Sequence, residues 1–334
     1  MFRKGVIHTM KIICSKSSLL KSVSIALKAV PSKTTMPILE CILMDATTHQ
    51  IKFTTNDMEL GIETIVEGTI EEKGKVALDA KIFYEIIRRL PDNDVTIKTD
   101  DKYAATITCE KAKFNIPGKS GEDFAYLPMI EKDEPLTISQ YTLKEMIRQT
   151  IFSIAVNENN KLMTGELFEI KNNCLKVVSL DGHRISIRKM SLKKDYSDRK
   201  VVVPGKTLSE VSKILSGEVD DRFFINLTYQ KCGTVDTIQE LFFVDLQFCL
   251  IITGKHLVNS AMGSMNEEID IEKEGKDIMI GFNPKFLIVA LRVIDDETVT
   301  IYLVNPKAPC FIRDDEENYT YLILPVNINQ NQAR

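Results

Sequence analysis

Two stretches of the sequence decide the fold: KVALDAKIFYEIIRRL, which begins at Lys75, and KVVVPGKTLSEVSKIL, which begins at Lys200. Each combines a short run of β-type residues, a turn, and a helix whose apolar residues recur at i, i+3 and i+4. These stretches lie 125 residues apart, and a second pair, QIKFTTNDME from Gln50 and CLKVVSLDGHR from Cys174, lies 124 apart. Similarity at a fixed period is the signature of a repeated structural unit.

The repeat predicts two full units near the N-terminus. The helical patterns that begin at Leu19 and Leu143 also lie 124 residues apart. With the two pairs above, they bound a first domain at 10–130 and a second at 134–255. The C-terminal part of the second domain departs from the pattern of the first.

A third, shorter unit follows at 256–329. The run IMIGFNPKFLIVALRVIDDETVTIYL, from Ile278, repeats the strand–helix–strand pattern, but only 77 residues after Val201. About 48 residues of the period are therefore absent, and we expect a truncated third domain without its N-terminal half. Its helix is expected at Pro284–Ile294, with the apolar run 241–252 as the available cover for the apolar face of that helix.

Local signals in the sequence favour α+β units. Segments such as DVTIKTDD and TVTIYLVN alternate as half-buried strands do. Ser15 or Ser17, Asp79 and Asn283 stand where helix N-caps are expected, and Pro284 follows in a first turn. Each complete unit should therefore contain antiparallel sheets and two helices.

The composition is that of a globular protein. Of the 334 residues, 44% are hydrophobic and 27% are charged, and the mean hydropathy is -0.07. No apolar run approaches the roughly 18 residues of a membrane span. The seven cysteines include no C-x-x-C pair, which favours reduced thiols over disulfides or zinc. We therefore expect a cytoplasmic protein without a membrane partner.

The sequence lacks the usual catalytic and metal-binding signatures. Neither a phosphate-binding G-x-x-x-x-G-K-[ST] nor a G-x-G-x-x-G, H-E-x-x-H or G-x-S-x-G motif is present. The four histidines have no ligand partners at metal-binding spacing. We therefore expect no catalytic residues, no metal and no cofactor. A binding protein is favoured, and an enzyme of unknown type is the weaker alternative.

Basic residues concentrate in the predicted helices. The net charge is -4, yet the five helical segments together carry +10, which leaves -14 for the rest of the chain. Four of these helices carry cations spaced i, i+7, and the fifth carries Lys144 and Arg148 at i, i+4, so each pair lies on one helix face. The four i, i+7 pairs are Lys21/Lys28, Lys81/Arg88, Lys206/Lys213 and Lys285/Arg292. A solvated helix face would explain each pair taken alone. Together, the basic helix faces suit binding of a polyanion through its backbone, without recognition of its bases.

Three segments resemble the bacterial DNA polymerase III β subunit, the β sliding clamp. They are MKIICSKSSLLKSVSIALKAVPSKTTMPILECIL from Met10, SLDGHRISI from Ser179 and YLILPVNIN from Tyr321. The resemblance implies three sliding-clamp domains per subunit, with antiparallel sheets outside and two helices per domain inside. It also implies a homodimeric ring around duplex DNA, and a non-catalytic processivity factor for the replicative polymerase.

The resemblance also implies two sites. One is the DNA-binding surface, formed by Lys33, Lys81, Lys206, Lys21, Lys28 and Arg88. The other is a pocket for short peptides of the DNA polymerase III catalytic subunit, the clamp loader, and other replication and repair proteins. One pocket wall is Met163, Leu180, Gly182, His183, Arg184 and Ile185, and the other is Leu322, Leu324, Pro325 and Val326.

One segment departs from the family pattern. In 222–262 the closing strands of the second domain and the first elements of the third are not recognisable in the sequence. A shortened third domain would weaken the subunit interface and favour monomers. The alternative to a closed ring is therefore a clamp-like interaction scaffold that keeps the peptide pocket but does not close.

Overall fold

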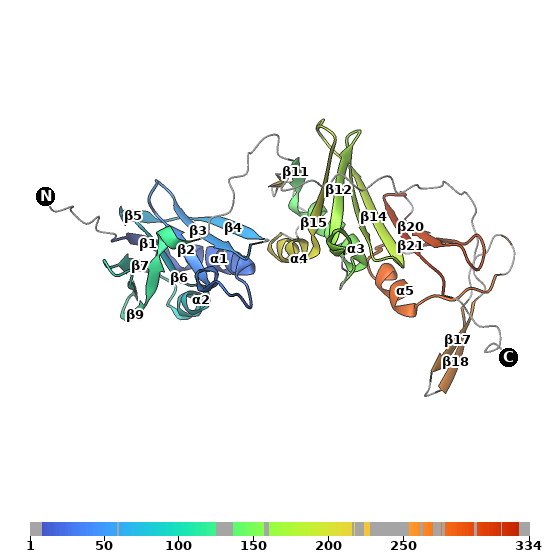
Figure 1. Ribbon diagram of the computed structural model, residues 1–334, viewed down its shortest axis with the longest axis horizontal. Coiled ribbons are helices and arrows are strands. Elements are labelled where there is room, and N and C mark those ends of the chain that lie inside the picture. The colour runs from blue at the N-terminus through green and yellow to red at the C-terminus, as the bar shows by residue number, and fades with distance from the viewer. Residues whose placement is uncertain are drawn as a thin grey trace. The chain divides into compact units, whose positions relative to one another are not determined.

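The computed structural model of the chain divides into two compact units, 1–129 and 130–334. It describes residues 9–58, 60–124, 136–156, 160–215, 217, 275, 278–296, 299–314 and 316–326, and the backbone of three further strands. Those strands are β16 (Phe224–Leu227), β17 (Gly254–Ser260) and β18 (Gly263–Ile269). Each unit is described by itself below (Figure 1).

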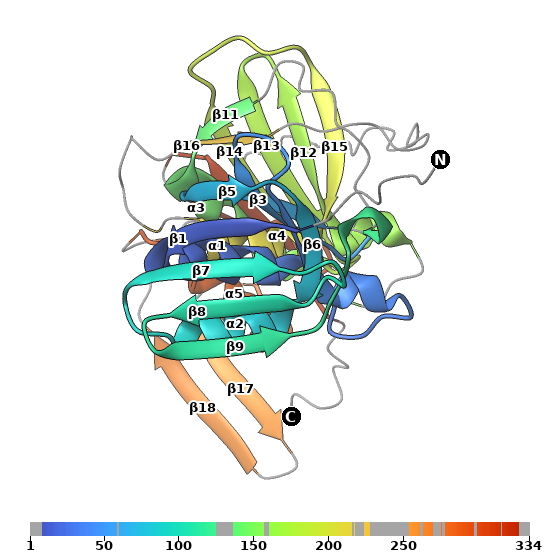
Figure 2. The ribbon, with the colours of Figure 1, turned by 90° about the vertical axis from the view of Figure 1, so that its left-hand side faces the viewer.

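The first unit contains two antiparallel five-stranded sheets and two helices. In order, the first sheet is β5 (Thr69–Glu72), β1 (Lys11–Ser15), β7 (Asp94–Thr99), β8 (Ala105–Cys109) and β9 (Ala112–Ile116). The second sheet is β10 (Gly118–Ser120), β6 (Lys75–Asp79), β2 (Cys41–Asp45), β3 (Ile51–Asn56) and β4 (Gly61–Val66). The helices are α1 (Lys16–Ala26) and α2 (Ala80–Arg89), with 3-10 turns η1 (Leu27–Ala29), η2 (Pro37–Glu40) and η3 (Gly121–Asp123). Figure 2 shows β7, β8 and β9 in front of these helices.

Capping and burial explain the helices of the first unit. The Ser15 hydroxyl accepts a hydrogen bond from the Ser18 N–H, and the Asp79 carboxylate accepts one from the Ile82 N–H. Apolar side chains of both helices enter a core shared with both sheets, in which Leu19 and Phe83 are fully buried. The predicted N-caps and the prediction of two helices are confirmed here.

The second unit is built around a seven-stranded antiparallel sheet. In order, its strands are β15 (Arg199–Pro204), β12 (Gly165–Lys171), β13 (Cys174–Leu180), β14 (Arg184–Ser191), β21 (Tyr319–Ile323), β20 (Cys310–Arg313) and β19 (Thr300–Tyr302). Two strand pairs accompany it, β11 (Leu136–Ser139) with β16, and β17 with β18. The helices are α3 (Gln140–Thr150), α4 (Gly205–Ile214) and α5 (Pro284–Leu291), with 3-10 turns η4 (Ile151–Ser153) and η5 (Lys161–Thr164). Strands from the second and third sequence repeats therefore share one sheet.

Strand order reproduces the sequence repeat. The first unit contains the run β6-β2-β3-β4 and the second contains β15-β12-β13-β14, with each strand in the equivalent place. Likewise, β11 pairs with β16 as β1 pairs with β7. The closing strands of the second domain are not recognisable in the sequence, but the backbone of β16 forms the equivalent ladder.

The third repeat has one helix among its described residues. Helix α5 is capped by Asn283, as predicted, but ends at Leu291 rather than Ile294. The expected cover of this helix, 241–252, lies outside the described residues. Other cover is visible: Ala290 and Val293 pack in a core with Tyr321 of β21 and Phe152 of η4. The third repeat thus shares its core with residues of the second.

Two general features complete the fold. No helix in the described part of the chain is long and apolar enough to cross a membrane. Cys14, Cys41, Cys109 and Cys310 are buried free thiols, and Cys174 is a half-buried one. Burial raises the pKa of Cys14 and Cys310 to about 12, so both stay protonated at neutral pH.

Candidate functional sites

Helices α1 and α2 place most of the predicted DNA-binding cations in the first unit. The two helices pack side by side, and Leu19 and Phe83 turn inward from them. The cations lie at exposed positions, namely Lys21 on α1, Lys28 on η1, Lys33 in the loop that follows, and Lys81 and Arg88 on α2. Lys206 is exposed on α4 of the second unit.

Some basic residues of the helices have intramolecular partners. Arg88 pairs with Glu85 at 2.8 Å, and Lys213 pairs with Glu210 at 2.6 Å, within their own helices. Exposed pairs of this kind contribute little to stability and still present a cation to solvent. Arg88 and Lys213 therefore remain compatible with phosphate binding.

The interpretation of α3 as a basic face of the same kind is wrong. The Lys144 ammonium donates to the Leu215 carbonyl, which lies at the end of α4, at 3.2 Å. Arg148 pairs with both Glu145 and Asp295, each at 2.6 Å. These two cations join elements of the second unit, so α3 contributes structure rather than free positive charge.

The two predicted walls of the peptide pocket meet at one end of the β14–β21 ladder. Ile185 stands opposite Leu322 in this ladder, and the Leu324 N–H donates to the His183 carbonyl at 2.8 Å. The Val326 N–H then donates to the Gly281 carbonyl at 2.8 Å. Residues distant in sequence are thus held side by side by backbone hydrogen bonds.

The turn between β13 and β14 shapes the first wall. Gly182 has a φ of +82°, a conformation that side chains disfavour. The Asp181 carboxylate accepts hydrogen bonds from the N–H groups of His183 and Arg184, at 3.0 and 3.2 Å. The Met163 methyl lies 4.0 Å from where a Cβ of residue 182 would be. Leu180, at the end of β13, completes the turn.

Arg184 has a structural role in the site and is not a free ligand-binding group. Its side chain is only 12% exposed and pairs with Asp181 at 2.9 Å. The guanidinium also donates to the Phe152 carbonyl and lies 4.4 Å from the centre of the Phe286 ring. His183 stacks on the same ring, with centroids 6.4 Å apart. The arrangement fastens α5 of the third repeat to the second repeat.

Phe152 and Phe286 were missed by the sequence analysis. Neither residue belongs to a recognisable motif, and Phe152 carries no positional signal. The position of Phe286, three residues after the N-cap Asn283, is the only pattern that sets it apart. Its contact with Arg184 depends on the β14–β21 pairing, which sequence spacing does not indicate.

Within the described ranges, no group of three or more His, Cys, Asp or Glu side chains could hold a metal ion. What the two sites offer is exposed positive charge on helices and an apolar wall built by strand pairing. The fold and these sites define a clamp-type protein, made of repeated domains that present binding surfaces.

Comparisons with known proteins agree with this class. Family models of the DNA polymerase III beta subunit match the N-terminal domain at 10–128, the central domain at 137–242 and the C-terminal domain at 250–327. The chain belongs to this family, the beta sliding clamps, which are non-catalytic processivity factors of DNA polymerase. The matches cover most of 222–262, where the sequence alone shows no family pattern.

Individual relatives cover nearly all of the chain. The beta sliding clamp of Staphylococcus aureus is 28% identical over 356 aligned positions, which cover 90% of this chain and 94% of that protein. A Eubacterium rectale crystal structure described as a DNA polymerase III beta subunit is 54% identical, with a TM-score of 0.85; the match covers 96% of this chain and 100% of that one. The crystal structure of the Bacillus subtilis sliding clamp is 27% identical, with a TM-score of 0.87. That match covers 96% of this chain and 100% of the other.

Proposed function

We propose that this clamp closes around duplex DNA as a homodimer and tethers the polymerase through the β14–β21 site. The observation that carries the proposal is the set of exposed cations on α1, α2 and α4 of an otherwise acidic chain. Phosphate contacts of this kind bind DNA without reading its sequence. A cytoplasmic location belongs to the same proposal and rests on the family.

A topological experiment tests the closed ring. The clamp is loaded by a clamp loader onto a nicked circular plasmid, and the plasmid is then cut once. A closed ring should stay on the circle and leave the linear form from its ends. Equal retention on both forms would favour the non-closing scaffold instead.

The first prediction concerns the basic helices. The triple variant Lys33→Glu, Lys81→Glu, Lys206→Glu should bind all duplex sequences more weakly. The slope of log affinity against log salt should fall in magnitude by about 5, because the dimer loses six phosphate contacts and each removes about 0.9. Fluorescence anisotropy at several salt concentrations measures both quantities.

A charge-matched control accompanies this variant. Lys73, Lys98 and Lys102 are exposed residues of the first unit that lie on turns or strands rather than helices. Their replacement by Glu changes the net charge equally but should leave most of the DNA affinity intact. Equal losses in both variants would show a bulk-charge effect and contradict the assignment to the helices.

The second prediction concerns the peptide site. The side chains of Leu324 and Val326 are 40% and 50% exposed and are available to a peptide with one or two large apolar anchors. Burying such an anchor is worth about 1.5–3 kcal/mol. Leu324→Asp with Val326→Asp should therefore weaken peptide binding by at least tenfold, measured by anisotropy of a labelled peptide.

Val304 provides the control for the peptide site. It is 42% exposed in the same unit but lies between β19 and β20. Val304→Asp should bind the peptide as the unchanged chain does. The assignment fails if the double variant retains full affinity, or if Val304→Asp loses as much.

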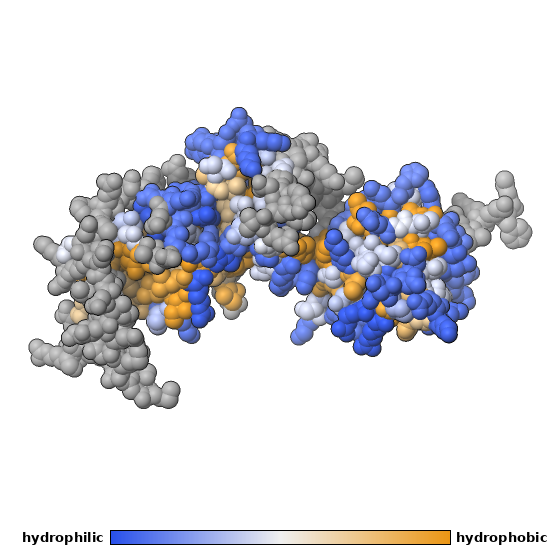
Figure 3. All heavy atoms as spheres, turned by 180° about the vertical axis from the view of Figure 1, so that it is seen from behind, coloured by the Kyte–Doolittle hydropathy of each residue, from blue (hydrophilic) through white to orange (hydrophobic). Residues whose placement is uncertain are grey.

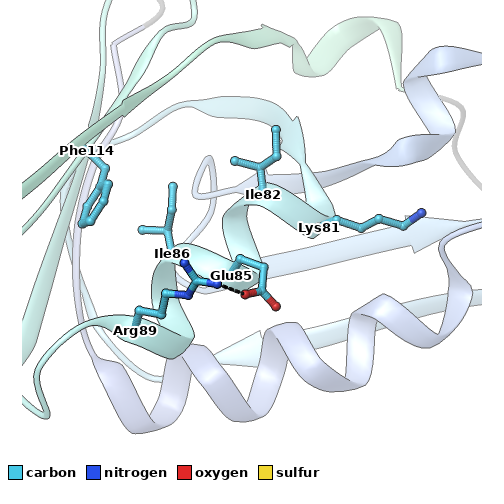
Figure 4. Close-up of a pocket in the computed structure, with 6 residues that line it drawn as sticks. All are labelled: Lys81, Ile82, Glu85, Ile86, Arg89 and Phe114. Atoms are coloured by element: carbon cyan, nitrogen blue, oxygen red, sulfur yellow. Dashed lines mark hydrogen bonds and ion pairs between the residues drawn. The ribbon is translucent and has the colours of Figure 1, made fainter.

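An apolar groove between α2 and β9 is the candidate subunit surface. Its lining residues are Lys81, Ile82, Glu85, Ile86, Arg89 and Phe114. Figure 4 shows Ile82 and Ile86 projecting from α2, with Phe114 on the neighbouring strand. Ile82 is 50% exposed and Phe114 is 39% exposed, which is unusual for large apolar side chains so close together.

The repeat indicates what covers this groove. Ile82 follows its N-cap by three residues, as Phe286 does, and Phe114 stands opposite Ile107 as Tyr321 stands opposite Ile312. In the third repeat these equivalents are covered by residues of the second: Arg184 lies over Phe286, and Phe152 lies 5.8 Å from Tyr321. A second copy of the chain would cover Ile82 and Phe114 in the same way.

The third prediction follows from this comparison. Ile82→Asp with Phe114→Asp should shift the protein to monomers at micromolar concentration, because two charges would be buried without partners. Sedimentation velocity measures the shift. Val156→Asp, at an exposed apolar position of the second unit, should leave the dimer intact. A double variant that remains dimeric would show that closure uses another surface.

A further inference from the structure

A row of charged side chains crosses the sheet of the second repeat on the face away from the helices. Pairing in the sheet places its four members directly opposite one another on β15, β12, β13 and β14: Lys200, Glu169, Lys176 and Lys189. Phe168 and Ile170, which flank Glu169 along β12, enter the core beneath α3 and α4. By the alternation of side chains along a strand, the charged row points to the opposite side.

Glu169 neutralises only part of this row. Its carboxylate pairs with Lys176 and, at 2.9 Å, with Lys200. Burial acts to raise the pKa of Glu169, but hydrogen bonds and charge from the two lysines outweigh it and lower the pKa. Glu169 is therefore ionised and fully engaged by these two lysines.

Three further lysines join Lys189 at one end of the sheet, and we call these four residues the basic tip. They are Lys171, Lys189, Lys193 and Lys194, and all are exposed. Among the described residues, none of the four has a carboxylate within ion-pair distance. Figure 3 shows hydrophilic residues gathered at this end of the strands, at the top of the view. The basic tip therefore presents uncompensated positive charge.

The first repeat provides an internal comparison. At offsets of 124 or 125 the equivalent row is Lys75, Asp45, Lys52 and Ile65, and the same strand pairings join it. Here Lys52 pairs with Glu63 at 3.0 Å, and Lys75 pairs with Glu122 at 2.7 Å. The shared architecture therefore does not require an excess of lysines at this end of the sheet.

Charge counts show how far the two copies differ. In the second repeat, 169–176 and 189–200 hold seven cations and three carboxylates. The equivalent 45–52 and 65–75 hold three cations and four carboxylates. The excess belongs to one copy alone, on a chain whose net charge is -4.

We propose that the basic tip is a docking surface for an acidic, Glu- and Asp-rich segment of a partner protein. Lysine ammonium groups on flexible stems suit carboxylates presented by an extended or helical peptide. Single-stranded nucleic acid would call for aromatic platforms. The one aromatic residue in these segments, Tyr196, packs on the domain core instead. The proposal does not depend on ring closure or on the peptide pocket.

The test uses the full-length protein and a labelled 12-residue peptide of glutamates. A carbodiimide joins glutamate carboxyls to nearby lysine amines without a spacer, and mass spectrometry then identifies the lysines that react. We expect the adducts to concentrate on the basic tip. A triple variant, Lys189→Glu with Lys193→Glu and Lys194→Glu, should bind the peptide at least fivefold more weakly in anisotropy measurements. Added salt should weaken binding of the peptide to the unchanged chain.

Two controls make the result decisive. The charge-matched variant Lys73→Glu, Lys98→Glu, Lys102→Glu should keep peptide binding within twofold. A 12-nucleotide single strand should bind less tightly than the peptide and should not lose affinity in the basic-tip variant. Adducts concentrated on the helix lysines, equal losses in both triple variants, or oligonucleotide binding that depends on the basic tip would each overturn the proposal.

Discussion

Replacing Glu166 with Gln should remove a loss of stability that the second unit suffers as pH rises. Glu166 lies on the core face of β12, fully buried, and within the described part of the chain neither carboxylate oxygen has a hydrogen-bond partner. The nearby Thr150 hydroxyl donates to the Met146 carbonyl instead. Burial raises the pKa of Glu166 from 4.5 to about 8, and Thr150 opposes this more weakly.

The raised pKa of Glu166 means that the free energy of unfolding falls as pH rises. The unfolded chain releases the Glu166 proton near pH 4.5, whereas the folded chain holds it to about pH 8. Stability is therefore fully present below pH 4.5 and falls until about pH 8, by roughly 5 kcal/mol at most. Between pH 5 and pH 9, the free energy of unfolding of Glu166→Gln should rise relative to the unchanged chain by roughly 3–5 kcal/mol. Denaturant titrations at each pH measure this difference.

Glu169, three residues further along the same strand, gives the matched control. Its pKa is lowered, so its contribution to stability is present above pH 4.5 and is lost as pH falls through its folded pKa. Glu169→Gln should therefore leave the profile between pH 5 and pH 9 parallel to that of the unchanged chain. Parallel profiles for Glu166→Gln as well would show that Glu166 is ionised in the fold.

Replacing Arg184 with Met should cost the second unit roughly 3 kcal/mol of stability and weaken peptide binding. The substitution keeps an unbranched apolar stem but leaves Asp181, itself 15% exposed, without its cation. It also removes the guanidinium from the Phe286 ring and from the Phe152 carbonyl. Urea unfolding and peptide anisotropy on the same samples measure both effects.

Two other variants separate the causes. Arg184→Lys keeps the charge but loses the planar stacking. Its stability and peptide affinity should therefore lie between those of the unchanged chain and of Arg184→Met. Arg188→Met breaks a comparable pair with Asp314, 2.8 Å apart, which also joins the second repeat to the third but involves no aromatic ring. If Arg184→Met unfolds at the same urea concentration as the unchanged chain, Arg184 does not stabilise the second unit.

The fold is predictable from sequence where one signal repeats. The offset of 124 or 125 residues is enough to match β3 with β13, β6 with β15, and the second helix of one unit with that of the next. Polar residues at helix starts locate the N-caps Ser15, Asp79 and Asn283. The joining of β14 to β21 does not follow from the repeat, because a sheet that spans two repeats leaves no periodic trace in either one. Only the family resemblance places residues of both segments in one pocket.

The sites are predictable in composition but only partly in geometry. The exposed lysines on α1, α2 and α4 follow from helix periodicity, which identifies the face a cation occupies. The partners of Lys144 and Arg148 do not follow from helix periodicity, because Leu215 and Asp295 lie 71 and 147 residues further along the chain. Glu166 was also missed, since an acid in an alternating strand gives no sign of lying on the buried face.

The seven-stranded sheet has a consequence for how the clamp loses structure. Backbone hydrogen bonds run without interruption from β15 of the second repeat to β19 of the third. Strands that share such a ladder open together rather than one by one. In native-state hydrogen exchange, the amides of β13, β14 and β21 should therefore form one cooperative unit with a common opening free energy. The boundary between the second and third sequence repeats would then not be a boundary between independently unfolding parts.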